Sequence, residues 1–243
     1  PPLSLVDYRF QLVAGGLFTT SVDRTVVLNY IAVYNGSAWV PLTTGVTGGS
    51  SPAVNVLQVW QDVLYVGGQF EEAGGLAASA IAAWDGAAWA PVGTGLGQVD
   101  DDVGEPFVGA LHVYVDRLLV AGHFATAGGV PVFNGLAQWD GAQWAAPLPP
   151  NSGLGEASAL TSDGEVLYVA APSTARPELW TVARANPLLG VWLNDVGTAF
   201  ANVFAGAVLA STSLNALALF NHTVVVGGDF RTVNGLEVNS LAR

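Results

Sequence analysis

The chain of 243 residues contains no cysteine, no methionine and, among its seven basic residues, no lysine. The absence of cysteine excludes disulfide bonds, thiolate metal sites and a cysteine nucleophile. Acidic residues number 19, and the net charge of −12 argues against binding to nucleic acid or to anionic membrane surfaces, which both require a basic surface. Because 51% of the residues are apolar and only 11% are charged, we expect a folded chain with a large core.

Helical periodicity and long apolar runs are also lacking. No stretch of ten or more residues repeats its apolar positions with a helical period. The best candidate for a membrane span, residues 196–211, is short and contains Asn202, so we expect buried strands there and no membrane insertion. The sequence opens on Pro1-Pro2, without an initial methionine or a signal peptide, which favours a piece of a longer protein.

A Gly-Gly-x-Phe element recurs along the chain at a nearly constant spacing. Its phenylalanines stand at positions 18, 70, 124 and 230, so the steps are 52, 54 and 106 residues, the last being twice 53. A degenerate copy is therefore expected near position 173, where residues 166–173 keep the apolar run and lack both glycines. We expect the glycines of the other copies to allow close backbone approach or unusual dihedral angles. They are Gly15, Gly16, Gly67, Gly68, Gly122, Gly227 and Gly228.

An Asx-Gly pair follows each of the first three elements, between two aromatic residues that stand five positions apart. Asx-Gly favours a hairpin turn because these residues tolerate positive φ. We expect the flanking aromatic residues to pack across the two strands. The pairs are Asn35-Gly36, Asp85-Gly86 and Asp140-Gly141, flanked by Tyr34 and Trp39, by Trp84 and Trp89, and by Trp139 and Trp144.

Two short apolar strands precede the Gly-Gly element, with predicted turns at Gln61-Asp62, Asp116-Arg117 and Asn221-His222. Each repeat therefore holds four strands in about 53 residues, which is typical of a β-propeller blade. We predict an all-β fold over residues 1–243, a β-propeller of four-stranded antiparallel blades whose ring is incomplete in this segment. A continuation of the chain or a partner segment would complete the ring. The blades are expected at 1–48, 49–103, 104–152, 153–212 (degenerate) and 213–243 (partial).

The segments "LYVGGQF", "IAAWDGAAWAPVGTGLG", "LLVAGHF" and "LAQWDGAQW" resemble the kelch and galactose-oxidase-like propellers. They are similar to the subgroup found in fungal cortical polarity-marker proteins and in large surface proteins. The resemblance implies that the first strand of each blade is innermost, the Gly-Gly strand is second, and the Asx-Gly hairpin supplies the third and outermost strands. A copper radical oxidase of this family needs a cysteine crosslinked to tyrosine, so that activity is not expected here.

The resemblance favours a non-catalytic scaffold or protein–protein interaction module of a larger extracellular or cell-surface structural protein. Its partners would be other subunits or domains of the same assembly. A fold alone does not fix a function, so two alternatives stay open. A carbohydrate-binding propeller would be favoured by exposed tryptophan or tyrosine on one face. A hydrolase using carboxylates between blades would be favoured by acidic residues gathered at the central channel.

Four groups of residues are candidates for function. Asp100, Asp101, Asp102 and Glu105 could surround Ca²⁺, although they lack the EF-hand spacing and better fit a solvated loop between blades. No other cofactor is expected. Asn35 and Asn221 open glycosylation sequons. Nothing in the sequence brings His112, His123 and His222 together as a metal site. The residue after Gly-Gly varies between repeats and is a candidate for recognition: Leu17, Gln69, His123 and Asp229.

Overall fold

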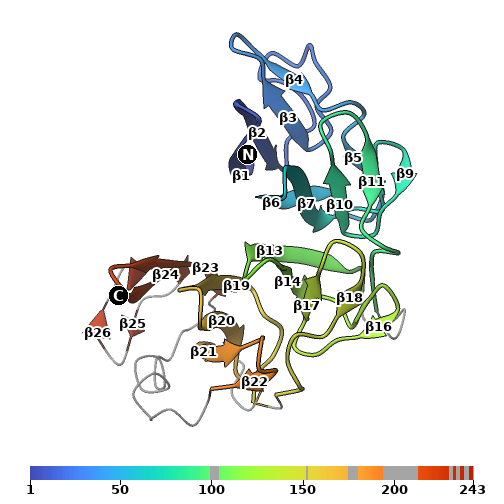
Figure 1. The fold of residues 1–243 in the computed structure, drawn as a ribbon. Helices are drawn as coiled ribbons and strands as arrows, with labels where there is room; N and C mark the ends of the chain where they lie inside the picture. The colour runs from blue at the N-terminus through green and yellow to red at the C-terminus, as the bar shows by residue number, and fades with distance from the viewer. Residues whose placement is uncertain are drawn as a thin grey trace.

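A computed structural model describes residues 1–98, 104–151, 153–174, 180–193, 213–229, 232–233, 236–237 and 241–242. These residues form strands and turns and no helix, and so none that could cross a membrane. The all-β prediction is confirmed, and the described strands include four antiparallel sheets of four strands each. Figure 1 shows the sheets following one another along an arc, with β1, β6 and β13 on its inner side and β4, β11 and β18 on its outer side. The described residues do not close into a ring.

Five sheets, called units 1 to 5 here, follow the chain in order. Unit 1 holds β1 (Pro2–Tyr8), β2 (Gln11–Gly16), β3 (Ile31–Tyr34) and β4 (Trp39–Pro41), and unit 2 holds β6 (Ala53–Trp60), β7 (Val63–Gln69), β10 (Ile81–Trp84) and β11 (Trp89–Pro91). Unit 3 holds β13 (Phe107–Val113), β14 (Leu118–His123), β17 (Leu136–Trp139) and β18 (Trp144–Ala145), and unit 4 holds β19 (Ala159–Ser162), β20 (Leu167–Pro172), β21 (Trp180–Asn186) and β22 (Val191–Trp192). Unit 5 holds β23 (Ser213–Phe220), β24 (Thr223–Asp229) and β27 (Leu241–Ala242).

Two-residue turns join the first two strands of units 1, 2, 3 and 5. Both central residues have positive φ, which is the signature of the type I′ turn that fits the twist of a hairpin. The turn of unit 3 is centred on Val115-Asp116, so the prediction of Asp116-Arg117 was wrong by one residue. The reason is that Tyr114 and Arg117 pair through two backbone hydrogen bonds and close the turn one position earlier.

Of the two roles predicted for the Gly-Gly pairs, the structure shows close backbone approach. It does not show unusual dihedral angles, because none of these glycines has positive φ. The first strands of units 1, 2, 3 and 5 carry a β-bulge near their starts. The bulge turns backbone toward the second glycine of the pair. A Cβ atom on Gly68 would overlap the carbonyl oxygen of Ala53, and one on Gly122 would overlap that of Phe107.

The Asx-Gly hairpins are confirmed, with a loop of four residues in place of a two-residue turn. Tyr34 pairs with Trp39, Trp84 with Trp89, and Trp139 with Trp144. Asp85 Oδ1 accepts hydrogen bonds from the amides of Ala87 and Ala88, both at 2.8 Å. Within each loop only the glycine of the Asx-Gly pair has positive φ. Each aromatic pair packs with tilted rings whose centroids lie 5.1 to 5.4 Å apart.

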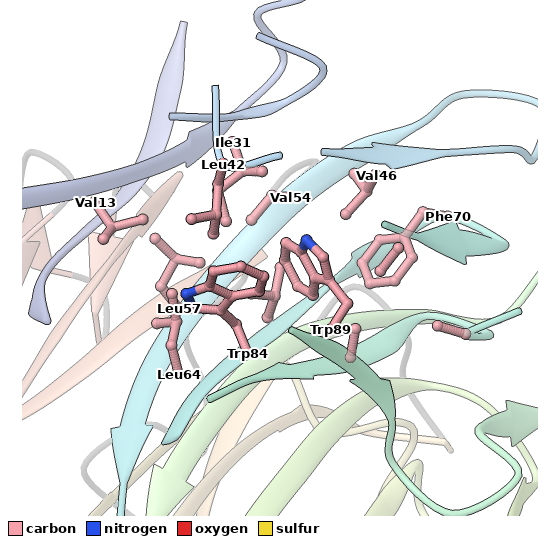
Figure 2. Packing of buried hydrophobic residues seen from close by; sticks show 14 of the residues in the cluster. Val13, Ile31, Leu42, Val46, Val54, Leu57, Leu64, Phe70, Trp84 and Trp89 are labelled. Atoms are coloured by element: carbon pink, nitrogen blue, oxygen red, sulfur yellow. The ribbon is translucent and has the colours of Figure 1, made fainter. Parts of the chain in front are cut away.

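The core lies between neighbouring units. Between units 1 and 2, Val13 and Ile31 meet Leu57, Leu64 and the Trp84–Trp89 pair, as Figure 2 shows. Short strands reinforce the junctions of unit 1 with unit 2 and of unit 2 with unit 3, where the strand that follows one unit pairs with a hairpin of the next. These short sheets are β5 (Val46–Thr47), β8 (Glu72–Ala73) and β9 (Leu76–Ala77), then β12 (Leu96–Gly97), β15 (Thr126–Ala127) and β16 (Val130–Pro131), while β25 (Thr232–Val233) pairs with β26 (Leu236–Glu237).

Candidate functional site

Each unit has one edge at which its second strand ends and its first strand begins, called the strand-end edge here. The four candidate recognition residues lie at this edge, because Gln69, His123 and Asp229 end β7, β14 and β24, and Leu17 follows β2. Leu17 and Asp229 are exposed, whereas Gln69 and His123 are half-buried. The two half-buried side chains both reach across to the unit that follows.

A polar cluster at the first of these crossings joins unit 2 to the segment that leads into unit 3. Glu105 Oε1 and Oε2 each lie 2.9 Å from the Ser50 amide nitrogen, and Oε2 also accepts from Ser50 Oγ and Gln69 Nε2, both at 3.0 Å. The Ser50 amide, followed by the Gln69 amide and the Ser50 hydroxyl, holds the pKa of Glu105 below its usual range. Glu105 is therefore a charged link between units. Its predicted calcium partners, Asp100, Asp101 and Asp102, lie outside the described residues.

A histidine–carboxylate pair occupies the corresponding crossing between units 3 and 4. His123 Nδ1 lies 2.7 Å from Glu156 Oε2 and 2.8 Å from Oε1. The Phe107 ring stacks on the imidazole with a centroid distance of 5.7 Å. A ring held on one face and at one nitrogen has a fixed orientation. This arrangement can pass a proton or bind a polar ligand, and it also ties the two units together.

The opposite edge, where the first and second strands turn, carries another set of links between units. Arg9 Nη2 lies 2.6 Å from Asp62 Oδ2, and Gln61 donates to Asp116 at 2.8 Å. The Tyr8 hydroxyl donates to the Asp62 carbonyl oxygen at 3.1 Å, and the Arg9 guanidinium holds the pKa of Asp62 below its usual range. Polar side chains at both edges thus serve the junctions.

The inner strands contain one histidine–serine contact. His112 Nε2 on β13 lies 2.8 Å from Ser162 Oγ on β19. Within the described part of the chain, no carboxylate bonds to the other ring nitrogen of His112, so the pair lacks the orienting acid of a catalytic triad.

The three histidines lie apart from one another. His112 is on an inner strand, His123 is at the strand-end edge and His222 is in the turn of unit 5. Over the described ranges no group of three or more histidine or acidic side chains could hold a metal ion.

Burial lowers the pKa of His112, which predicts a pH dependence of stability. The unfolded chain binds the proton near pH 6.5, whereas the folded chain resists it to lower pH, so stability is full above about pH 6.5 and falls below it. His112→Gln should reduce the loss of denaturation midpoint between pH 7.5 and pH 5.5, because glutamine does not take up a proton. Glutamine is a suitable replacement, since Gln58 stands at the same register position in unit 2. His222→Gln, on the exposed turn, is the control. An equal loss in wild type and His112→Gln would contradict the prediction.

The tryptophans of units 2 and 3 do not form an exposed aromatic platform. Trp84, Trp89, Trp139 and Trp144 are all buried between units. A hollow of about 210 Å³ opens between units 2 and 3, and Tyr65, Asp85 and Trp139 help to line it. Burial raises the pKa of Tyr65, so its hydroxyl stays protonated.

Exposed apolar residues that sequence reasoning missed lie on the hairpins between the second and third strands. Leu76 on β9 and Val130 on β16 are exposed, each directly after a Gly-Gly tip with positive φ at both glycines. The repeated Gly-Gly-Leu and Gly-Gly-Val would have been the signal in the sequence. Each hairpin leaves the strand-end edge, and its glycine tip lies against the fourth strand, at Trp89 in unit 2 and at Trp144 in unit 3. The two apolar side chains therefore lie near the outer strands of these units.

Both candidate glycosylation sites are accessible. Asn35 is exposed in the first Asx-Gly loop, where its Oδ1 accepts from the amides of Ser37 and Ala38. Its Nδ2, the atom that would carry a glycan, donates no hydrogen bond within the described residues. Asn221 is exposed in the type I′ turn of unit 5.

The chain matches no protein-family model and none of the curated proteins. Solved structures resemble it at low identity. A computationally designed protein, Ika8, is 13% identical with a TM-score of 0.44, over 96% of this chain and 69% of the designed one. A protein described as a candidate 6-phosphogluconolactonase from Bacteroides fragilis is 11% identical with a TM-score of 0.41, over 99% and 85%. A protein described as a candidate hydrolase from Bacteroides ovatus is 12% identical with a TM-score of 0.41, over 99% and 77%. TM-scores of this size carry no argument about function.

Proposed function

We propose that the chain is a segment of a β-propeller of the kelch and galactose-oxidase-like kind. It serves as a non-catalytic scaffold and protein–protein interaction module of a larger extracellular or cell-surface structural protein. Four-stranded sheets that pack face to face with their first strands inward support the propeller. The exposed sequons at Asn35 and Asn221 support an extracellular setting.

One observation carries the scaffold role: the side chains best suited to chemistry are used to join units. Gln69 and Glu105 link unit 2 to the start of unit 3, and His123 and Glu156 link units 3 and 4. A charged group that satisfies its hydrogen bonds within the fold stabilises the junction and has less capacity left for a substrate. Recognition then falls to exposed apolar residues, above all Leu17 at the same edge and Leu76 and Val130 on the hairpins that leave it.

The two alternative functions rest on weaker observations. A carbohydrate platform requires exposed rings, and the buried tryptophans of units 2 and 3 do not supply them. The hollow beside Tyr65 and Asp85 is the feature that favours a sugar ligand. A hydrolase requires a pair of carboxylates in a cleft, and Glu105 and Glu156 each belong to a separate junction.

Site-specific crosslinking tests the interaction role. A photo-reactive phenylalanine analogue at position 76 should crosslink to a defined protein partner in intact cells that produce the protein, because Leu76 is an exposed apolar residue on the hairpin of β8 and β9. The same analogue at position 87, in the exposed Asp85-Gly86 loop at the opposite edge, is the matched control. Mass spectrometry of the crosslinked bands identifies the partner.

An activity screen supplies the opposing outcome. We expect no turnover of lactones, aryl esters or aryl glycosides above the buffer rate. Turnover that disappears in Glu156→Gln, while the folded fraction by circular dichroism is unchanged, would establish an enzyme and overturn the proposal. Equal crosslinking at positions 76 and 87 would also count against it.

A further inference from the structure

The hollow between units 2 and 3 has smaller side chains in its apolar wall than the matching place between units 1 and 2. Register pairs Ala83 with Ala90 across the third and fourth strands of unit 2, and the same position of unit 1 pairs Val33 with Val40. The two valines pack into the core between units 1 and 2. Ala83 is half-buried, Ala90 is exposed, and both line the hollow. Alanine thus leaves open a space that valine fills in the preceding junction.

The hollow also carries two polar side chains that unit 1 lacks at the same places. Tyr65 holds the second-strand position that Val13 holds in unit 1. Asp85 follows the third strand of unit 2, where Asn35 follows that of unit 1. Tyr65 and Asp85 both line the hollow. A hydroxyl and a carboxylate therefore stand at this junction in place of a methyl-bearing side chain and a neutral amide.

Asp85 has one carboxylate oxygen left for a ligand. Its Oδ1 accepts from the amides of Ala87 and Ala88, and no group in the described ranges donates to its Oδ2. The two amides, that of Ala88 first, hold the pKa of Asp85 below its usual range, so the carboxylate is charged at neutral pH. Arg9 also acts on this carboxylate, but its guanidinium is already bound to Asp62 at 2.6 Å. The hollow therefore keeps a negative charge.

We propose that the hollow binds a small primary alkylammonium ion, whose ammonium group donates to Asp85 Oδ2 and whose alkyl chain lies on Ala83 and Ala90. The net charge of −12 raises the local concentration of cations. The aromatic rings of Tyr65 and Trp139 in the lining attract organic cations as well. A single free carboxylate oxygen suits a compact ammonium better than a planar guanidinium, which binds a carboxylate through both oxygens.

The size and the place of the hollow favour a free small molecule over a protein partner. Its volume of about 210 Å³ lies below the range of about 300 to 1,000 Å³ that is usual for drug-sized ligands. The hollow lies at the edge where the first and second strands turn, because Val63 begins β7 there and Asp85 follows β10. It is thus remote from the strand-end edge, and the inference does not depend on what binds at that edge.

Proton–nitrogen correlation NMR of the 243-residue chain tests the proposal. Butylammonium chloride, titrated at an ionic strength held constant with sodium chloride, should shift the Ala88 and Gly141 amide signals and the Trp139 indole signal, with a dissociation constant of about 1 mM. Butanol has the same chain without the charge and should bind at least about tenfold more weakly. Methyl glucoside should leave these signals in place.

Three variants assign the binding to the hollow. Asp85→Asn keeps the oxygen that accepts the loop amides, as Asn35 does in unit 1, and should weaken butylammonium binding by about tenfold or more. Ala83→Val combined with Ala90→Val restores the side chains of unit 1 and should abolish binding. Asp163→Asn is the matched control, because Asp163 Oδ1 also accepts two loop amides, in unit 4, and it should bind like wild type.

Several results would overturn the proposal. One is the absence of shifts at the hollow up to roughly 20 mM butylammonium. Equal weakening in Asp85→Asn and Asp163→Asn would reduce the effect to net charge, and shifts at the hollow with methyl glucoside but not with butylammonium would make the ligand a sugar. Unchanged signals in the other units establish that each variant is folded, and Asp85→Asn decides the matter if the double valine variant is not.

Discussion

Gly68→Ala is expected to lower the free energy of unfolding by about 3 kcal/mol or more. The new Cβ would overlap the carbonyl oxygen of Ala53 and crowd the backbone of Val54. Both partners are backbone atoms beside the bulge of β6, so no rotamer change can make room. Chemical denaturation followed by tryptophan fluorescence measures the effect, because the Trp84–Trp89 pair lies in the same unit.

Gly227→Ala is the matched control for this substitution. Gly227 is also in the second strand of its unit and has ordinary φ, and the nearest atom to a new Cβ is 3.6 Å away. The change should alter stability by less than about 1 kcal/mol and could raise it, since alanine restricts the unfolded chain. Similar losses of unfolding free energy in the two variants would show that close backbone approach is not the reason for glycine at position 68.

Trp144→Ala should cost about 3 to 5 kcal/mol, the usual range for removing a buried tryptophan. The indole is buried between units 2 and 3, with its ring tilted against Trp139 at 5.1 Å. A Cβ on Gly128 would lie 2.5 Å from its Cδ1 and one on Gly93 would lie 2.8 Å from its Nε1, so the glycines shape the space that it fills. Alanine would leave a cavity and an unpaired Val92 carbonyl oxygen.

Trp39→Ala tests whether the junction is the source of that cost. Trp39 occupies the same hairpin position in unit 1 and is only half-buried, and no other unit packs on it among the residues that the structure describes. We expect a loss of about 1 kcal/mol in the free energy of unfolding, because less apolar area of this side chain is buried. A Trp39→Ala loss as large as that of Trp144→Ala would show that the tilted aromatic pair itself, and not packing between units, supplies the stability.

The repeat made much of the local structure predictable. Positive φ and short apolar runs are properties of single turns and strands, so the Asx-Gly hairpins and the strand at β20 could be located from spacing alone. The turn of unit 3 was misplaced because Val115, a β-branched residue, adopts positive φ there. That conformation is unfavourable in isolation and is imposed by the pairing of the flanking strands.

The polar junctions could not be predicted in the same way. Gln69 and Glu105 are 36 residues apart in the sequence, and His123 and Glu156 are 33 residues apart. Each pair joins one unit to the next. The sequence marked Gln69 and His123 only as variable positions and placed Glu105 in a loop. Their partnership follows from how one sheet is set against the next, which no local pattern encodes.

The sequence by itself determined the strand content, the four-strand period and the positions of most turns, because these follow from side-chain size, backbone preference and alternation along a short segment. Only the tertiary structure decided which aromatic and polar groups are buried at a junction and which remain on an open face. Leu5 and Leu57 have the same residue type and the same place in the repeat, yet one is exposed and the other buried. The difference arises because burial depends on whether another unit packs against that face.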